Sequence, residues 1–178
     1  ALFRVQLPNT DGTRIVSVGA NALSVSMLTP YTSWEEDFLP RIEKALTAYM
    51  EIASPTNVTR IGVRYINKIS IPKEQANPQE YFTAAIPEDT LIKGETTSFA
   101  KRFEFKVDGD IKIILTHATL VSEAIEKAEY LLDVDAVSDG QQLTDKKQIL
   151  EKAAALHSRE GEVFEALITD KARKLFDA

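Results

Sequence analysis

The chain has 178 residues, 44% of them hydrophobic, and its 21 basic and 27 acidic side chains give a net charge of −6 at pH 7. This length suits one moderately large domain or two small halves that share a core. The absence of cysteine excludes disulfides, thiol nucleophiles and thiolate metal sites, and the negative charge does not favour nucleic acid as a partner. No apolar run approaches the roughly 18 residues of a membrane span. We therefore expect a cytoplasmic protein that makes no contact with a membrane.

The first part of the chain is predicted to form three strands. Alternating or β-branched runs mark them at 2–7, 13–18 and 22–27. Asp11-Gly12 marks the turn between the first two strands. Because a strand pattern is already present at the first residues, we expect the chain to be a fragment of a longer protein.

A helix is predicted to follow these strands. Ser33, with Glu36 three residues later, forms the pattern of a capped helix start. Pro40 lacks the N–H that a helix interior needs and clashes with the preceding turn. It therefore predicts either a kink or a first turn separate from a helix that begins near Pro40.

Residues 60–71 give the clearest strand pattern. Apolar side chains occupy the odd positions except at Asn67, and the even positions carry a basic row of Arg60, Arg64 and Lys68. An unpaired buried amide costs about 1–3 kcal/mol. We therefore predict that Asn67 bonds a backbone group or a buried polar side chain where the sheet meets an irregular segment.

The rest of the chain is predicted to form an irregular connection at 72–100, with a short helix at 78–84, and then a second set of elements. Strand patterns lie at 101–107, 110–116 and 131–137, and a long helix opens at Thr144. Asp108-Gly109 predicts a hairpin turn, and Thr169 is placed to cap a short final helix.

These elements predict an α+β fold in which a mostly antiparallel sheet of about six or seven strands packs on two long helices. The single domain would span 1–178 and contain two similar βββα halves, 1–71 and 101–178. One core is expected to unite the strands at 60–71, 102–107 and 110–116 with five helical residues. These are Trp34, Phe38, Ile42, Leu156 and Phe164.

The basic row is the first candidate binding site. Arg60, Arg64 and Lys68, together with Asn67, are placed to grip a phosphate or a carboxylate. Alternatively, each basic side chain pairs across strands with Glu104, Asp133 or Asp135, or is solvated. Asn67 contacts a ligand on the first interpretation and fixes the connection at 72–100 on the second.

A catalytic or metal-dependent site lacks most of its usual parts. Asp133 and Asp135 are spaced to hold a divalent cation, but a third acid and a Gly-rich phosphate loop are not evident, and an outward strand face gives the same pattern. His117 and His157 lack a zinc-binding spacing, and there is no serine elbow. We therefore predict no catalytic residue and no cofactor.

The favoured function is a non-catalytic protein-binding or assembly module whose partner is another protein. The alternative is a phosphate- or nucleotide-handling enzyme that combines the basic row with Asp133, Asp135 and a divalent metal.

Four segments together resemble one family. They are LTPYTSWEEDF, RIGVRYINKI, LLDVDAV and LHSREGEVFEALITDKARKLF. The chain resembles a sporadically distributed bacterial and archaeal family of uncharacterised proteins. Family members are longer, and the resemblance implies that this chain corresponds to their C-terminal two-thirds. It implies no activity, cofactor or catalytic residue.

Overall fold

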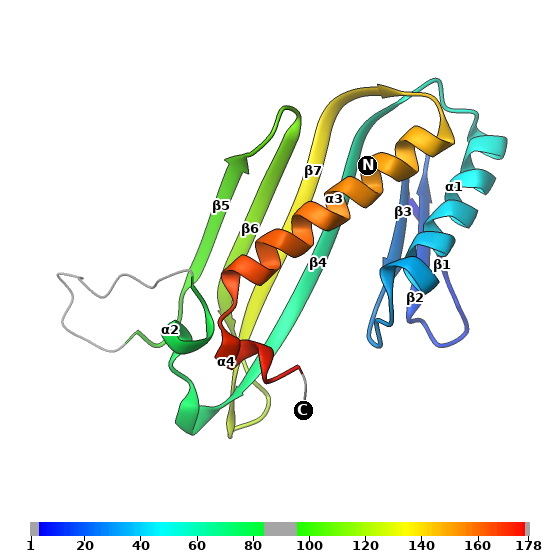
Figure 1. Cartoon of the computed structure of the whole chain (residues 1–178). Coiled ribbons are helices and arrows are strands. Elements are labelled where there is room, and N and C mark those ends of the chain that lie inside the picture. The colour runs from blue at the N-terminus through cyan, green and yellow to red at the C-terminus, as the bar shows by residue number, and fades with distance from the viewer. Residues whose placement is uncertain (1–3, 84–95, 177–178) are drawn as a thin grey trace. The chain divides into compact units, whose positions relative to one another are not determined.

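The computed structural model describes residues 4–83 and 96–176 (Figure 1). The strands are β1 (Arg4–Pro8), β2 (Arg14–Gly19), β3 (Ala22–Met27), β4 (Val58–Pro72), β5 (Ala100–Lys106), β6 (Ile111–Leu120) and β7 (Lys127–Leu143). The helices are the π-helical turn η1 (Trp34–Phe38), α1 (Leu39–Ala53), the 3₁₀ turn η2 (Lys73–Gln75), α2 (Pro78–Tyr81), α3 (Lys146–Leu167) and α4 (Asp170–Arg173). The seven antiparallel strands and two long helices confirm the predicted α+β class.

The strands form two sheets rather than one. β1, β2 and β3 make a three-stranded meander, and the second sheet has the order β4-β7-β6-β5. β4 has 15 residues and β7 has 17, whereas β1 has 5 and β2 and β3 have 6 each. A long strand leaves fewer backbone groups unpaired beside a partner of similar length. β4 and β7, which are neighbours in the second sheet, are therefore matched in length.

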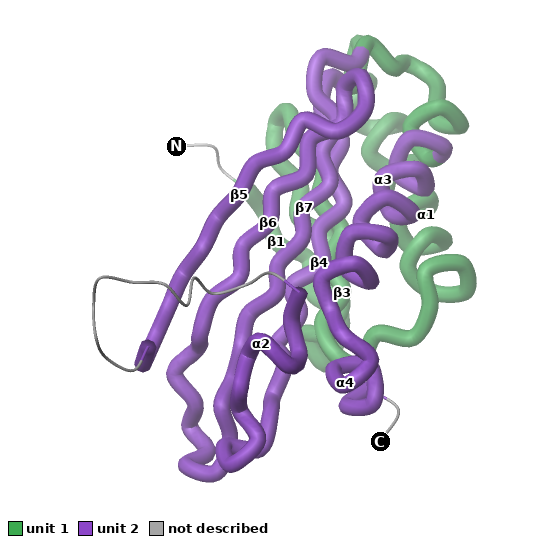
Figure 2. Tube along the Cα trace, turned by 60° about the vertical axis from the view of Figure 1, so that its left-hand side comes forward, with its two compact units in different colours: residues 1–58, 142–150 green, residues 59–141, 151–178 purple. Residues whose placement is uncertain are grey.

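The chain divides into two compact units, which Figure 2 shows in different colours. Unit 1 comprises Ala1–Val58 and Gln142–Leu150, and unit 2 comprises Thr59–Gln141 and Glu151–Ala178. Trp34 belongs to unit 1 and Leu156 to unit 2, so a core that unites them stays a prediction. The element order does repeat as predicted, since each three-stranded meander is followed by a long helix.

In unit 1, Pro40 determines how the helix begins. The Ser33 hydroxyl accepts a hydrogen bond from the Glu36 N–H at 3.2 Å, which confirms the predicted N-cap. The next bonds have π-helical spacing, with the Phe38 N–H on the Ser33 carbonyl at 3.0 Å. α1 then starts with Pro40 in its first turn, where a missing N–H is tolerated. The α-helix therefore begins near Pro40, as the second alternative predicted, but the first turn is not separate, because η1 continues directly into α1.

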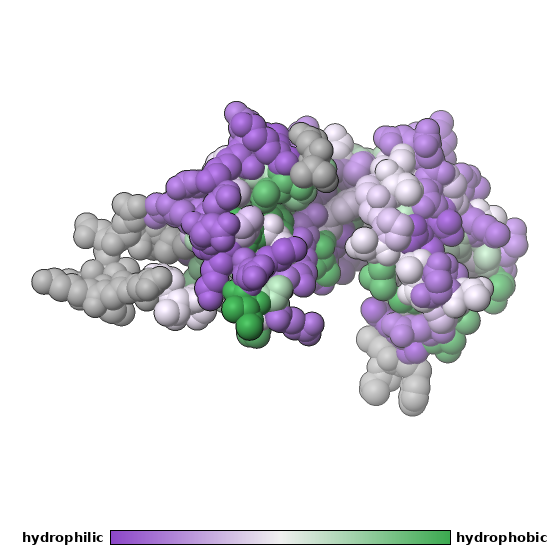
Figure 3. All heavy atoms as spheres, turned by 90° about the horizontal axis from the view of Figure 1, so that it is seen from below, coloured by the Kyte–Doolittle hydropathy of each residue, from purple (hydrophilic) through white to green (hydrophobic). Residues whose placement is uncertain are grey.

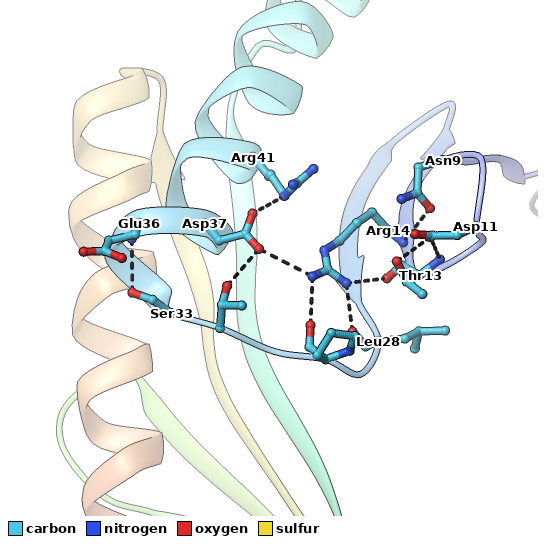
Figure 4. A network of polar contacts seen from close by, with 11 residues as sticks. Asn9, Asp11, Thr13, Arg14, Leu28, Ser33, Glu36, Asp37 and Arg41 are labelled. Atoms are coloured by element: carbon cyan, nitrogen blue, oxygen red, sulfur yellow. Dashed lines mark hydrogen bonds and ion pairs between the residues drawn. The ribbon is translucent and has the colours of Figure 1, made fainter.

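Arg14 ties the segment between β3 and η1 to β2 (Figure 4). Its guanidinium donates to the carbonyls of Leu28 at 2.9 Å and Pro30 at 2.8 Å. It also lies 3.5 Å from the Asp37 carboxylate, which accepts further hydrogen bonds from Arg41 and the Thr32 hydroxyl. One side chain thus satisfies backbone carbonyls that no strand or helix pairs.

In unit 2, α3 covers one face of the four-stranded sheet (Figures 1 and 2). The Tyr65 hydroxyl lies 3.2 Å from His157 Nδ1, and Lys152 approaches Asp110 at 3.1 Å, so α3 contacts both β4 and the β5–β6 hairpin. The buried core of this layer is apolar. It includes Ile69, Ile71, Ile113, Leu115, Leu132, Val134, Ala136 and Leu156.

The C-terminal residues of unit 2 pack beside α2. Thr169 accepts a hydrogen bond from the Ala172 N–H and so caps α4, as predicted. Phe82 forms a β-bridge with Ile168, and both side chains are buried. The predicted helix at 78–84 is shorter, since α2 ends at Tyr81, and residue 84 lies outside the described residues.

Candidate functional site

The basic row of β4 is paired with acids on β7. The Arg64 guanidinium donates twice to the Asp133 carboxylate, from Nε at 2.8 Å and from Nη2 at 2.6 Å. Asp133 is only 6% exposed, whereas the Arg64 side chain is about half exposed. The hydrogen bonds that Arg64 donates to the Asp133 carboxylate raise the pKa of the Arg64 guanidinium. Two parallel donor–acceptor bonds fix both the distance and the orientation of this pair.

The other two members of the row also have acidic partners. Arg60 lies 3.2 Å from Asp139, and Lys68 lies 2.9 Å from Glu129. All three pairs join β4 to its neighbour β7, and the even positions that Arg60, Arg64 and Lys68 occupy share one face of the sheet. Cross-strand pairing, which was the alternative interpretation of the basic row, therefore describes all three side chains. Of the expected partners, Asp133 is confirmed, whereas Arg60 and Lys68 pair with Asp139 and Glu129 instead of Glu104 or Asp135.

Asp135 is the acid on this face that lies closest to the Gly62 backbone. A Cβ atom at Gly62 would come within 3.5 Å of its Oδ1 atom. Burial raises the pKa of Asp135, against the lowering effect of Arg60 and Arg64. Because Arg64 occupies both oxygens of Asp133, the two aspartates do not present a free pair of carboxylates to a cation. Among residues 4–83 and 96–176, no three acidic or histidine side chains group as a metal site.

Asn67 has a structural partner within the sheet. Its side-chain amide donates to the Leu132 carbonyl of β7 at 3.2 Å. The predicted bond to a backbone group is therefore confirmed. Its predicted place, where the sheet meets an irregular segment, is wrong, because Leu132 lies in the middle of β7.

His117 is a buried polar residue whose burial was not predicted from the sequence. It is 0% exposed, and neither ring nitrogen has a hydrogen-bond partner among the described residues. The rings of Phe82 and Phe99 lie 4.5 Å and 4.8 Å from it, and Tyr130 lies 6.4 Å away. Burial, with a smaller contribution from Lys101, lowers the pKa of His117 to about 4. The imidazole is therefore neutral near pH 7 and packs as an aromatic side chain.

Glu160 is a further buried titratable group of unit 2. It is 4% exposed on α3, one turn after the fully buried Leu156, and its Oε1 atom has no hydrogen-bond partner in the described part of the chain. Burial raises the pKa of Glu160 to about 7. The helical spacing of Ala153, Leu156 and Glu160 was the available signal that this acid faces the core.

β5 presents an apolar row that the predicted core should have buried. The row consists of Phe103 and Phe105 of β5 and of Val107, which directly follows the strand; they are 43%, 49% and 41% exposed. Phe103 and Phe105 lie across from Leu115 and Ile113 of β6, and those two neighbours are buried. The two phenylalanine rings stack with centroids 6.0 Å apart. Burial thus stops at β6, and the prediction that this face of β5 lies in the core is wrong.

β5 is also an edge strand of its sheet. Among the described strands it pairs with β6 alone. From below, the surface is mostly hydrophilic, and apolar residues gather in separate patches (Figure 3). An edge strand that carries exposed aromatic side chains combines unpaired backbone groups with apolar area, and both features favour contact with another chain.

Comparisons with protein-family models, curated proteins and solved structures found no match for this chain. No helix in the described ranges is long and apolar enough to cross a membrane. The interpretation of the site therefore depends on the geometry of the chain itself.

Proposed function

We propose that the protein is a non-catalytic protein-binding or assembly module and that the apolar row of β5 is its contact surface. The observation that carries this proposal is the exposure of Phe103 and Phe105 on an edge strand, although the residues opposite them on β6 are buried. Aromatic side chains contribute much of the binding energy at protein interfaces. A partner that covers this row would extend the apolar layer that ends at β6.

The pairing of the basic row argues against the alternative of a nucleotide-handling enzyme. A phosphate would have to compete with the Asp133 carboxylate for Arg64, whose two donor groups are already engaged. A thermal-shift screen of nucleotides with Mg²⁺ and Mn²⁺ tests this alternative. We expect no stabilisation; a shift that Arg64→Ala and Asp133→Ala abolish would favour the enzyme.

Quantitative affinity capture from cell extract tests the proposed function. The double variant Phe103→Ser/Phe105→Ser should lose the proteins that the wild type retains. The matched control is Val121→Ser/Ile125→Ser, which removes two apolar side chains that are 97% and 87% exposed outside β5. Equal retention by all three proteins would contradict the assignment of β5 as the contact surface.

A further inference from the structure

The hydrogen bonds of the β5–β6 hairpin show which groups of β5 face its open edge. The Val107 N–H donates to the Ile111 carbonyl, and the Thr119 N–H donates to the Phe99 carbonyl. Bonded and non-bonded positions alternate along an antiparallel pair. The residues of β5 whose N–H and C=O groups point away from β6 are therefore Ala100, Arg102, Glu104 and Lys106.

We propose that β5 binds an extended segment of a partner protein as an added strand, and that apolar and acidic residues alternate in that segment. This inference rests on the proposed protein-binding function and specifies its partner. The backbone groups of the even positions on β5 provide the hydrogen bonds. Main-chain bonds of this kind hold a strand at a sheet edge, and side chains on its two faces supply the specificity.

The apolar residues of the partner segment would lie beside the apolar row. In a strand added to β5, the positions opposite Phe103 and Phe105 do not exchange backbone hydrogen bonds. Side chains at such positions approach each other more closely than those at bonded positions. Apolar partner residues there would cover the exposed parts of the two rings, which lie on the same face of the sheet as the buried Leu115 and Ile113.

The net positive charge of β5 favours acidic residues in the partner segment. The strand carries three basic side chains and one acidic one, although the whole chain has a net charge of −6. Glu104 is already engaged by Arg102 at 3.0 Å and by Lys112 at 3.8 Å. Lys106 makes no ion pair within residues 4–83 and 96–176. Acidic side chains opposite Arg102 and Lys106 would complement this edge.

The same charges disfavour a second copy of the chain as the occupant. Two β5 strands side by side would bring six basic side chains against two acidic ones. Like charges placed opposite each other across strands are destabilising. Basic residues on an edge strand therefore oppose self-pairing while leaving the edge open to an acidic segment.

The test uses fluorescein-labelled peptides of eight residues in which Val alternates with Glu, or with Lys as the charge control. Fluorescence anisotropy with the full chain should show that the Val-Glu peptide binds at least tenfold more tightly than the Val-Lys peptide. Glu104→Pro removes an outward N–H without removing a bond to β6, and should weaken binding at least tenfold. Glu104→Ala is the matched control, because it keeps the N–H and should bind at least as tightly as the wild type.

Three results would overturn the proposal. They are no binding of the Val-Glu peptide to the wild type, equal binding of the Val-Lys peptide, and undiminished binding to folded Glu104→Pro. If Glu104→Pro fails to fold, binding of the Val-Glu peptide is measured with Phe105→Lys instead. Binding as tight as that of the wild type would also overturn the proposal. A wild-type dimer in light scattering that becomes a monomer in either variant would assign the edge to a second copy. Capture that still depends on Phe103 and Phe105 in any of these cases would leave the proposed function standing.

Discussion

The buried carboxyl of Glu160 makes the stability of the chain depend on pH in a predictable way. A carboxyl whose pKa rises from 4.5 in the unfolded chain to about 7 in the fold binds its proton more tightly when folded. Its contribution is fully present below pH 4.5 and is lost as pH rises through about 7. At 1.36 kcal/mol per pKa unit, the loss amounts to about 3 kcal/mol.

Glu160→Gln removes this titration while keeping a side chain of similar size. The variant should therefore gain about 3 kcal/mol relative to the wild type between pH 4.5 and pH 7.5. His117 works in the opposite direction: its pKa is lowered to about 4, so its contribution rises with pH between about 4 and 6.5. In the wild type these two opposite pH dependences partly cancel where their pH ranges overlap. In Glu160→Gln the pH dependence due to His117 remains and can be measured.

Urea unfolding followed by far-ultraviolet circular dichroism measures this difference. Tryptophan fluorescence is less suitable, because the only tryptophan, Trp34, lies in unit 1 and Glu160 lies in unit 2. Glu162→Gln is the matched control, since Glu162 is an exposed acid on the same helix. The difference in the free energy of unfolding between Glu162→Gln and the wild type should change by less than about 1 kcal/mol over the same pH range. A difference between Glu160→Gln and the wild type that stays constant with pH would refute the reasoning.

Three further variants test the polar contacts of each unit. Arg64→Ala should cost about 1–3 kcal/mol because it leaves the buried Asp133 carboxylate without its partner, and the loss should be smaller in an Asp133→Asn background. Asn67→Leu should cost more than about 1 kcal/mol in urea unfolding; unchanged stability with lost partner binding would instead assign Asn67 to the site. Arg14→Ala should cost about 1–3 kcal/mol through two unpaired carbonyls, and Trp34 fluorescence should report this loss. Arg14→Lys, which keeps the charge but not the planar fork, should recover only part of it, and full recovery would show that charge alone matters.

Local signals predicted the elements of the fold well. The cap at Ser33, the turn at Gly109, which has a φ of 52°, and the cap at Thr169 depend on residues close in sequence. Pro40 likewise acts on its own turn. These features were predictable because backbone sterics and short-range hydrogen bonds determine them.

The division into two sheets and the exposed row on β5 depend on long-range contacts. Alternation at Phe103 and Phe105 shows that the strand has an apolar face, but it does not show whether a helix covers that face. Cross-strand pairing of the basic row with Glu104, Asp133 or Asp135 was one predicted alternative, but the partners Asp139 and Glu129 depend on how β4 and β7 lie together in the sheet. Glu160 was missed because an acid on an apolar helix stripe is more often solvated than buried.

Hydrogen–deuterium exchange of the chain with and without the Val-Glu peptide tests the central claim most directly. If β5 is the contact strand, the peptide should slow exchange in residues 100–106, where the outward N–H groups of Arg102, Glu104 and Lys106 gain acceptors. The edge strand β4 at the opposite side of the same sheet should be unaffected and serves as the internal control. Protection confined to β4 or to unit 1, or no protection at all, would contradict the account.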